Sequence, residues 1–222
     1  MKPNTEKRKQ TKRFNFSVEG ETEKWYLEWL RDVINKEPAR VFNVSFNIKV
    51  EKNPVKMVKF SSPMVGEIFF HFFDFESQYP AHVKQRNETF KLLKEAKNRK
   101  KIQYEAAYSN FSFELWILLH KTQLNQSFSD RKQYLPLINK YFGTAFADLR
   151  EFKIEKNFKS VLNSLNFSDV QTAMNNYGKI VEQCELNLIE KKTCGYSFYE
   201  ENPSSSVGET IQIILKACKL SS

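Results

Sequence analysis

The stretch IFFHFFDFES, residues 68–77, decides the fold of this chain. Its first six residues are almost all apolar, which is typical of a central strand covered on both faces of a sheet. Asp74 and Glu76 follow directly. A carboxylate after such a run is costly to bury unless it meets solvent or a cation. If the strand continues through Phe75, both carboxylates lie on one face of the sheet.

The segments around this stretch predict a parallel sheet. Apolar and alternating runs predict strands at residues 14–18, 41–50, 68–73 and 102–108. Helical spacing predicts a helix from about residue 21 that stops near residues 35–38, and a second helix at residues 80–101. The order strand–helix–strand–strand–helix–strand indicates a small, mainly parallel α/β sheet with flanking helices.

The pattern changes after residue 110. Helical spacing predicts helices at residues 111–121, 131–142, 152–165, 170–189 and 207–220. The last helix is preceded by Ser206, with Glu209 three residues later, which is the pattern of a capping box. We therefore predict three parts, namely a basic tail (1–13), an α/β core (14–110) and a helical half packed on that core (111–222).

Glu19 ends the first predicted strand, as Asp74 and Glu76 end the central one. Open parallel sheets bind ligands beyond the carboxyl ends of their strands, so these carboxylates are expected at one edge. Glu23 follows in the first helical turn, where the helix dipole alone favours acidic residues. One helical turn can also return Glu23 to the edge. An oxygen-only donor set without His or Cys favours Mg²⁺ or Mn²⁺ over zinc.

The net charge of +9 is concentrated in two segments. Residues 1–13 carry +5 and residues 84–101 carry +6, which leaves the rest slightly acidic. Two basic segments on a near-neutral body suit a polyanionic partner, although an exposed tail and a solvated helix face explain the charge equally well. The predicted nucleic-acid-binding residues on the second segment are Lys84, Arg86, Lys91, Lys94 and Lys97.

Several classes of protein are excluded. No run approaches the roughly 18 apolar residues of a membrane span, and the basic amino terminus lacks the apolar stretch of a signal peptide. The three cysteines have no paired metal-ligand spacing and fit reduced thiols, so we expect a cytoplasmic protein. Walker A, G-x-G-x-x-G, G-x-S-x-G and H-E-x-x-H motifs are all missing from the sequence.

Four motifs, in order along the chain, carry a family resemblance. VEGETE (18–23) resembles the first motif of Toprim domains, especially Toprim nucleases of the overcoming-lysogenization-defect class, and FFDFE (72–76) resembles the second. YSNFSFELWILLH (108–120) resembles a motif of the RloB-like family, and NPSSSV (202–207) is similar to that family's closing Asn-Pro-small-Thr motif. Members of that family carry a Toprim-type core and are linked to restriction loci and phage resistance.

The resemblance implies a role for each acidic residue at the edge. Glu19 matches the first-motif glutamate, a metal ligand or general acid/base, and Glu23 matches an accessory ligand. Asp74 matches the principal metal ligand. Glu76 stands where a second aspartate is usual, and its extra methylene puts a second metal position in doubt. The implied metal ligands are Glu19, Glu23, Asp74 and Glu76.

Glu114 and His120 have two interpretations. Trp116 and His120 lie four residues apart and share a helix face, which is more typical of a core with a satisfied histidine. The resemblance instead draws Glu114 and His120 towards the rim of the active site. The catalytic residues that it implies are Glu19, Asp74, Glu76, Glu114 and His120.

These patterns predict a Mg²⁺- or Mn²⁺-dependent nuclease that cleaves DNA or RNA in phage defence by abortive infection. Its expected partners are nucleic acid and a partner protein of the defence system, with no membrane. The sequence does not fix the oligomeric state. Two other functions fit the same residues. One is a non-catalytic nucleic-acid or protein interaction module with a Toprim-like core, and the other is a phosphotransfer or nucleotide-binding enzyme.

Overall fold

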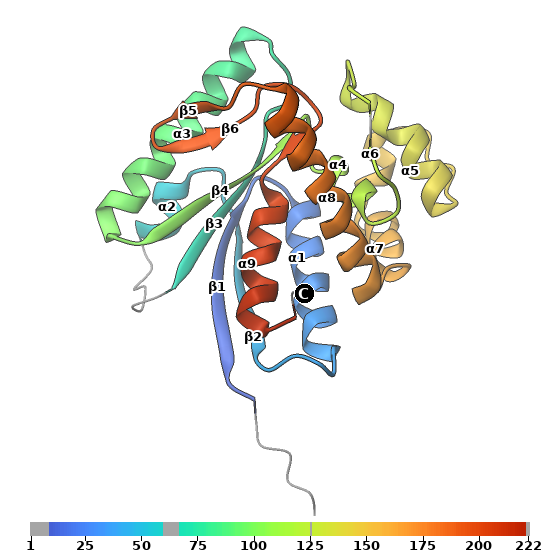
Figure 1. Cartoon of the computed structure of the whole chain (residues 1–222), viewed down its shortest axis with the longest axis horizontal. Helices are drawn as coiled ribbons and strands as arrows, with labels where there is room; N and C mark the ends of the chain where they lie inside the picture. Colours follow the sequence, from blue (N-terminus) through green and yellow to red (C-terminus); the bar gives the residue numbers. More distant parts are fainter. Residues whose placement is uncertain (1–8, 60–66, 125, 221–222) are drawn as a thin grey trace, which may run out of the picture.

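The computed structural model describes residues 9–59, 67–124 and 126–220 and has a mixed α/β architecture (Figure 1). Its main sheet has the strand order β2-β1-β3-β4-β7, and a separate hairpin is formed by β5 and β6. The strands are β1 (Thr11–Val18), β2 (Asn43–Val50), β3 (Ile68–Asp74), β4 (Gln103–Asn110), β5 (Lys191–Thr193), β6 (Tyr196–Phe198) and β7 (Ser204–Ser205). The helices are α1 (Glu21–Lys36), α2 (Pro54–Lys59), α3 (Pro80–Lys100), α4 (Glu114–Leu119), α5 (Tyr134–Phe142), α6 (Leu149–Phe152), α7 (Glu155–Asn163), α8 (Phe167–Asn187) and α9 (Val207–Cys218), with a 3₁₀ turn η1 (Arg131–Gln133).

The four longer strands of the main sheet are parallel. Val18 of β1 aligns with Phe72 of β3 and with Val50 of β2, so these strands leave the sheet at the same edge. That edge is called the carboxyl edge below. The prediction of a mostly parallel sheet followed by a helical half is confirmed.

Strand β3 is central and is covered on both faces, as its apolar sequence predicts. Phe70 and Phe72 pack into a core shared with α1, α4, α8 and α9. Phe69 and Phe73 point to the other face, into a core shared with α2, α3 and the β5–β6 hairpin. Each buried phenylalanine contributes about 1.5–3 kcal/mol by leaving water, so this strand anchors both layers.

The second half of the chain completes the sheet as well as covering it. Strand β7 adds to β4 in antiparallel register, with Ser205 opposite Ser109. The predicted capping box before α9 is wrong. The Ser206 hydroxyl donates to the Ala106 carbonyl at 2.8 Å and accepts from the Tyr108 N–H at 3.0 Å, because it satisfies the backbone beside β4. Figure 1 shows α9 lying beside α1 along the sheet.

Several element boundaries differ from the sequence predictions. Residues 11–13 of the predicted tail belong to β1, where Thr11 aligns with Asn43, and residues 1–8 lie outside the described part of the chain. Helix α4 is shorter than predicted, and the predicted helix at residues 131–142 begins as η1. Helix α2, the β5–β6 hairpin and β7 were not predicted. Among the described helices, none is long and apolar enough to cross a bilayer.

Candidate functional site

Four carboxylates gather at the carboxyl edge. Glu19 follows β1, and the backbone of Asp74, the last residue of β3, hydrogen-bonds to its side chain. Glu23 is one turn into α1, and Glu114 begins α4. The negative charges of Glu19, Glu23 and Glu114 each act on the pKa of Asp74, which lies among them. The structure therefore brings together three predicted metal ligands and one residue drawn in by the motif at residues 108–120.

Gly20 permits this arrangement. A Cβ atom at this position would lie 3.0 Å from Oε2 of Glu23. The Thr22 hydroxyl donates to the same oxygen at 3.0 Å. The glycine thus leaves room for the α1 carboxylate to fold back against the end of β1, and only 5% of Glu23 is exposed.

Lys153 supplies a cation to this cluster and was not found from the sequence. It caps the carboxyl end of α6, and its Nζ lies 2.7 Å from Oε1 of Glu114. Its charge also lowers the pKa values of Glu23 and Asp74. Oε2 of Glu114 is buried and has no hydrogen-bond partner among the described residues. The site therefore combines four carboxylates, one ammonium group and one unpartnered carboxylate oxygen.

Burial sets the protonation of the cluster. Loss of water raises the pKa of Glu19 to about 7, and it raises the pKa of Asp74 well above its usual range. Burial also raises the pKa of Glu23. Burial opposes ionisation of Glu114 too, but the adjacent Lys153 outweighs it and the pKa of Glu114 is lowered. Without a further cation, the cluster holds protons at neutral pH.

The donor chemistry fits a hard divalent cation at Glu19 and Asp74. Within residues 9–59, 67–124 and 126–220, no three His, Cys, Asp or Glu side chains are grouped closely enough to hold a metal ion by themselves. Mg²⁺ commonly uses only one or two carboxylates and completes its shell with water and substrate phosphate. The buried Oε2 of Glu114, which has no hydrogen-bond partner among the described residues, is a further oxygen in this donor set.

Glu76 does not stand beside Asp74. Strand β3 ends at Asp74, and Glu76 has a positive φ of 62° in the turn that follows. Its backbone N–H donates to the Phe111 carbonyl at 2.9 Å, and its carboxylate forms an ion pair with Arg131. The two carboxylates therefore do not share one strand face. Glu76 still raises the pKa of Glu19 electrostatically, so it borders the cluster.

His120 lies inside the protein, with 1% of its surface exposed. Its Nδ1 lies 3.0 Å from the Trp116 carbonyl and its Nε2 lies 3.2 Å from the Tyr26 hydroxyl. Burial lowers its pKa to about 4, so it is neutral, with Nδ1–H donating and Nε2 accepting. These contacts agree with the interpretation of Trp116 and His120 as core residues.

The basic segment forms α3, and Arg86 lies inside it. Arg86 is 3% exposed, donates to Glu200 at 2.6 Å and lies over the rings of Phe75 and Phe198. Its guanidinium therefore holds the β6 region against α3, and we leave Arg86 out of the nucleic-acid surface. The predicted residues that remain on the exposed face are Lys84, Lys91, Lys94 and Lys97.

Topology leads α3 away from the carboxyl edge. The helix follows β3 and returns to the start of β4, where Gln103 aligns with Ile68 (Figure 1). Its 21 residues span about 30 Å at 1.5 Å per residue. Lys84 thus lies near the candidate site, whereas Lys94 and Lys97 lie towards the opposite edge of the sheet.

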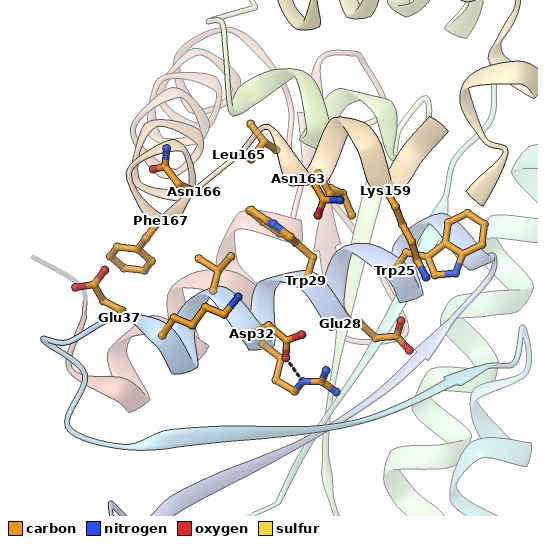
Figure 2. A pocket seen from close by; sticks show the side chains of 14 residues that line it. Trp25, Glu28, Trp29, Asp32, Glu37, Lys159, Asn163, Leu165, Asn166 and Phe167 are labelled. Carbon is orange, nitrogen blue, oxygen red and sulfur yellow. Dashed lines mark hydrogen bonds and ion pairs between the residues drawn. The ribbon is translucent and has the colours of Figure 1, made fainter. Parts of the chain in front are cut away.

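A groove of about 620 Å³ runs between α1 and α7 on another face of the molecule. Figure 2 shows Trp25 and Lys159 at one end of it and Glu37 and Phe167 at the other. Its three acidic residues balance its three basic ones, including the Arg31–Asp32 ion pair. A charge-balanced groove gives no net attraction for a polyanion, so we do not assign it to nucleic acid.

Comparison with known proteins agrees with the motifs at residues 108–120 and 202–207. A family model described as RloB-like protein matches residues 16–214, which include every carboxylate of the candidate site and Lys153. No curated protein and no solved structure matches the chain. Because the family match extends from β1 into α9, the chain belongs to the RloB-like protein family.

Proposed function

We propose that this protein is a Mg²⁺- or Mn²⁺-dependent nuclease that cleaves phosphodiester bonds of DNA or RNA in phage defence. The observation that carries the proposal is the group of four carboxylates with Lys153 at the carboxyl edge, in which Glu23 and Glu114 are buried and Glu19 and Asp74 are partly exposed. Ligands of open parallel sheets bind at this edge. The motifs at residues 18–23 and 72–76, which resemble Toprim sequences, supply three of the carboxylates.

Each residue has a proposed task. Glu19 and Asp74 hold the cation, and Glu23 supports them from α1. A bound divalent cation would supply Lewis-acid activation of the phosphate and of an attacking water. Lys153 pairs with developing negative charge on the phosphate, and it is 36% exposed, so substrate can reach it. Glu19, with a pKa of about 7 before a cation binds, can lose its proton near neutral pH and so become available as a ligand.

A cleavage assay tests the proposal. Purified protein is incubated with plasmid, single-stranded DNA and tRNA, with Mg²⁺ or Mn²⁺ and with chelator. We expect wild type to cut at least one substrate only when metal is present, and Glu19→Gln and Asp74→Asn to lose at least about a hundredfold in rate. The matched control is Glu21→Gln, on the exposed face of α1 beside Lys24, which keeps its activity. Equal cutting by wild type and both site variants would refute the proposal.

The rate should depend on pH through Glu19. A metal ligand must lose its proton, and the pKa of Glu19 is about 7. At limiting Mg²⁺, we expect cleavage to rise at least about tenfold per pH unit below pH 7, because Asp74 must lose its proton as well, and to rise less steeply once Glu19 is ionised. Saturating Mg²⁺ displaces the proton and moves the rise to lower pH. A rate that is flat from about pH 5.5 to 8 at limiting Mg²⁺ would count against this role for Glu19.

The second candidate is a non-catalytic interaction module of a defence system. Two observations favour it, since Lys153 already pairs with Glu114 and Arg131 already pairs with Glu76. Such a module would bind nucleic acid or a partner protein without metal and would leave every substrate intact. Tight binding of nucleic acid or of a partner protein, together with no cleavage, would favour this candidate over the nuclease.

A further inference from the structure

A cavity of about 470 Å³ opens beside the carboxylate cluster, where the chain leaves β3. Glu76 lines it and also acts on the pKa of Glu19, so the cavity and the cluster are neighbours. The residues around it that bear on ligand binding are Glu76, Ser77, Tyr79, His82, Phe111 and Arg131. Its lining carries two carboxylates, Glu76 and Asp130, against the single guanidinium of Arg131, so any affinity for an anion depends on Arg131 exchanging its partner and not on net charge.

The guanidinium of Arg131 lines this cavity, and its ion pair with Glu76 can be exchanged for a pair with another anion. The Arg131 side chain is 44% exposed and its partner Glu76 is 32% exposed, and an ion pair this open to water contributes little to stability. The neighbouring Asp130 also lines the cavity, but its carboxylate accepts the Lys132 N–H at 2.7 Å and caps η1, and among the described residues it forms no ion pair with Arg131. A phosphate matches the fork of a guanidinium in two parallel hydrogen bonds and can replace the carboxylate.

Tyr79 presents an open aromatic face to the same cavity. It immediately precedes α3 and is 72% exposed, although a ring of this size normally buries much of its surface. Its ring centroid lies 6.3 Å from that of His82, which is oriented by a 2.7 Å hydrogen bond with Ser77. Exposed aromatic rings next to a cationic group are the stacking platforms of proteins that bind single-stranded nucleic acid.

We propose that this cavity is a nucleotide subsite for the unpaired nucleotide next to the scissile bond, with Arg131 on its phosphate and Tyr79 stacked on its base. Glu76 holds Arg131 until that phosphate takes its place. The inference rests on the proposed function, because it takes the scissile bond to lie at the neighbouring carboxylate cluster. Binding of the nucleotide to the subsite does not itself require a metal ion. The shared chemistry, a phosphate with an unstacked base, occurs in single-stranded DNA and in single-stranded RNA.

The test measures binding without catalysis. Fluorescence anisotropy follows labelled oligothymidine, oligouridine and a DNA duplex at low salt, with chelator present. We expect Arg131→Gln to weaken binding of the single strands about tenfold, and Tyr79→Ser to weaken it about tenfold while Tyr79→Phe does not. Glu76→Gln, which removes the competing carboxylate, should tighten binding. Lys132→Gln is the matched control, because it removes the same charge one residue from Arg131 and does not line the cavity.

Opposite effects of the two ion-pair variants separate this proposal from a structural role. If the ion pair only stabilised the turn, Glu76→Gln and Arg131→Gln would weaken binding alike, and that result overturns the proposal. So does an equal loss for Arg131→Gln and Lys132→Gln, or a loss for Tyr79→Ser that is as large with duplex as with single strands. A preference between oligothymidine and oligouridine assigns the natural strand. Binding that follows the prediction in a protein that never cleaves would contradict the nuclease proposal alone.

Discussion

Asp74→Asn is expected to make the metal-free protein more stable while abolishing its metal-dependent cleavage. Asp74 is partly exposed and lies beside Glu19, Glu23 and Glu114, and loss of water together with those charges raises its pKa well above the usual range. A group with a raised carboxyl pKa binds its proton more tightly in the folded state, so stability falls as pH rises from the unfolded pKa through the folded one. Asparagine has no titrating carboxyl group, so the variant does not lose this stability as the pH rises.

Thermal unfolding with chelator at about pH 8 measures the effect. We expect Asp74→Asn to melt a few degrees above wild type, since 1 kcal/mol corresponds to about 2–4 °C in a chain of this size. Saturating Mg²⁺ should raise the melting temperature of wild type but not that of the variant, because binding stabilises only a folded state that holds the ion. Asp32→Asn, on the exposed face of α1, is the control and should change neither. A variant less stable than wild type in chelator would contradict this account of the cluster.

Lys153→Met is expected to destabilise the fold and to impair cleavage together. It leaves Glu114, only 2% exposed, without its cation. Breaking a fully buried pair costs about 3–5 kcal/mol, and we expect about 2 kcal/mol here because Lys153 is partly open to water. Asp74 and Glu23 also lose the charge that lowers their pKa values, so metal binding at neutral pH should weaken.

Urea unfolding of a double-mutant cycle isolates the pair. Glu114→Gln combined with Lys153→Met should recover most of the lost stability but none of the cleavage, because no charge remains uncompensated and no cation remains for the phosphate. Lys159→Met is the matched control, since it breaks an exposed pair with Glu155 and should cost less than about 0.5 kcal/mol. Additive effects of the two substitutions at Glu114 and Lys153 would mean that the ion pair does not couple them.

The sequence predicted the part of the site that depends on strand order. Apolar runs identified β1 and β3, and parallel strands bring their carboxyl ends to one edge, so the sequence alone could place Glu19 and Asp74 together. The return of Glu23 followed from one helical turn after Gly20. These predictions were possible because the hydrophobic periodicity of a strand or helix depends only on residues that are close in the sequence.

Other parts of the site depend on contacts that sequence periodicity does not contain. Lys153 caps a four-residue helix in the second half of the chain, and only tertiary packing brings it to Glu114. Glu76 does not continue the direction of β3, because its backbone has a positive φ. A positive φ is usually marked in the sequence by glycine, and this position has none. Arg86 was counted with the exposed lysines, but stacking on Phe75 moves it inside.

Short elements were missed for a similar reason. Strand β7 has two residues, and β5 and β6 have three each, so none is long enough to show alternation. The turn between β5 and β6 did carry a signal, since Cys194 and Gly195 both have positive φ and glycine favours this region. Ser206 shows the opposite error, a predicted feature that does not form. The capping-box pattern is present in the sequence, but the Ser206 hydroxyl bonds to the backbone of β4 and does not cap α9.

The most direct test of the central claim is to locate the metal. Crystals of the wild-type protein soaked in Mn²⁺ and measured near the manganese edge should give an anomalous peak at the carboxyl edge. The peak is expected within about 2.0–2.3 Å of carboxylate oxygens of Glu19 and Asp74, and it should vanish in Asp74→Asn. A peak that persists in that variant, a peak only at other residues, or no peak in wild type would contradict a divalent-metal site formed by these two strand ends.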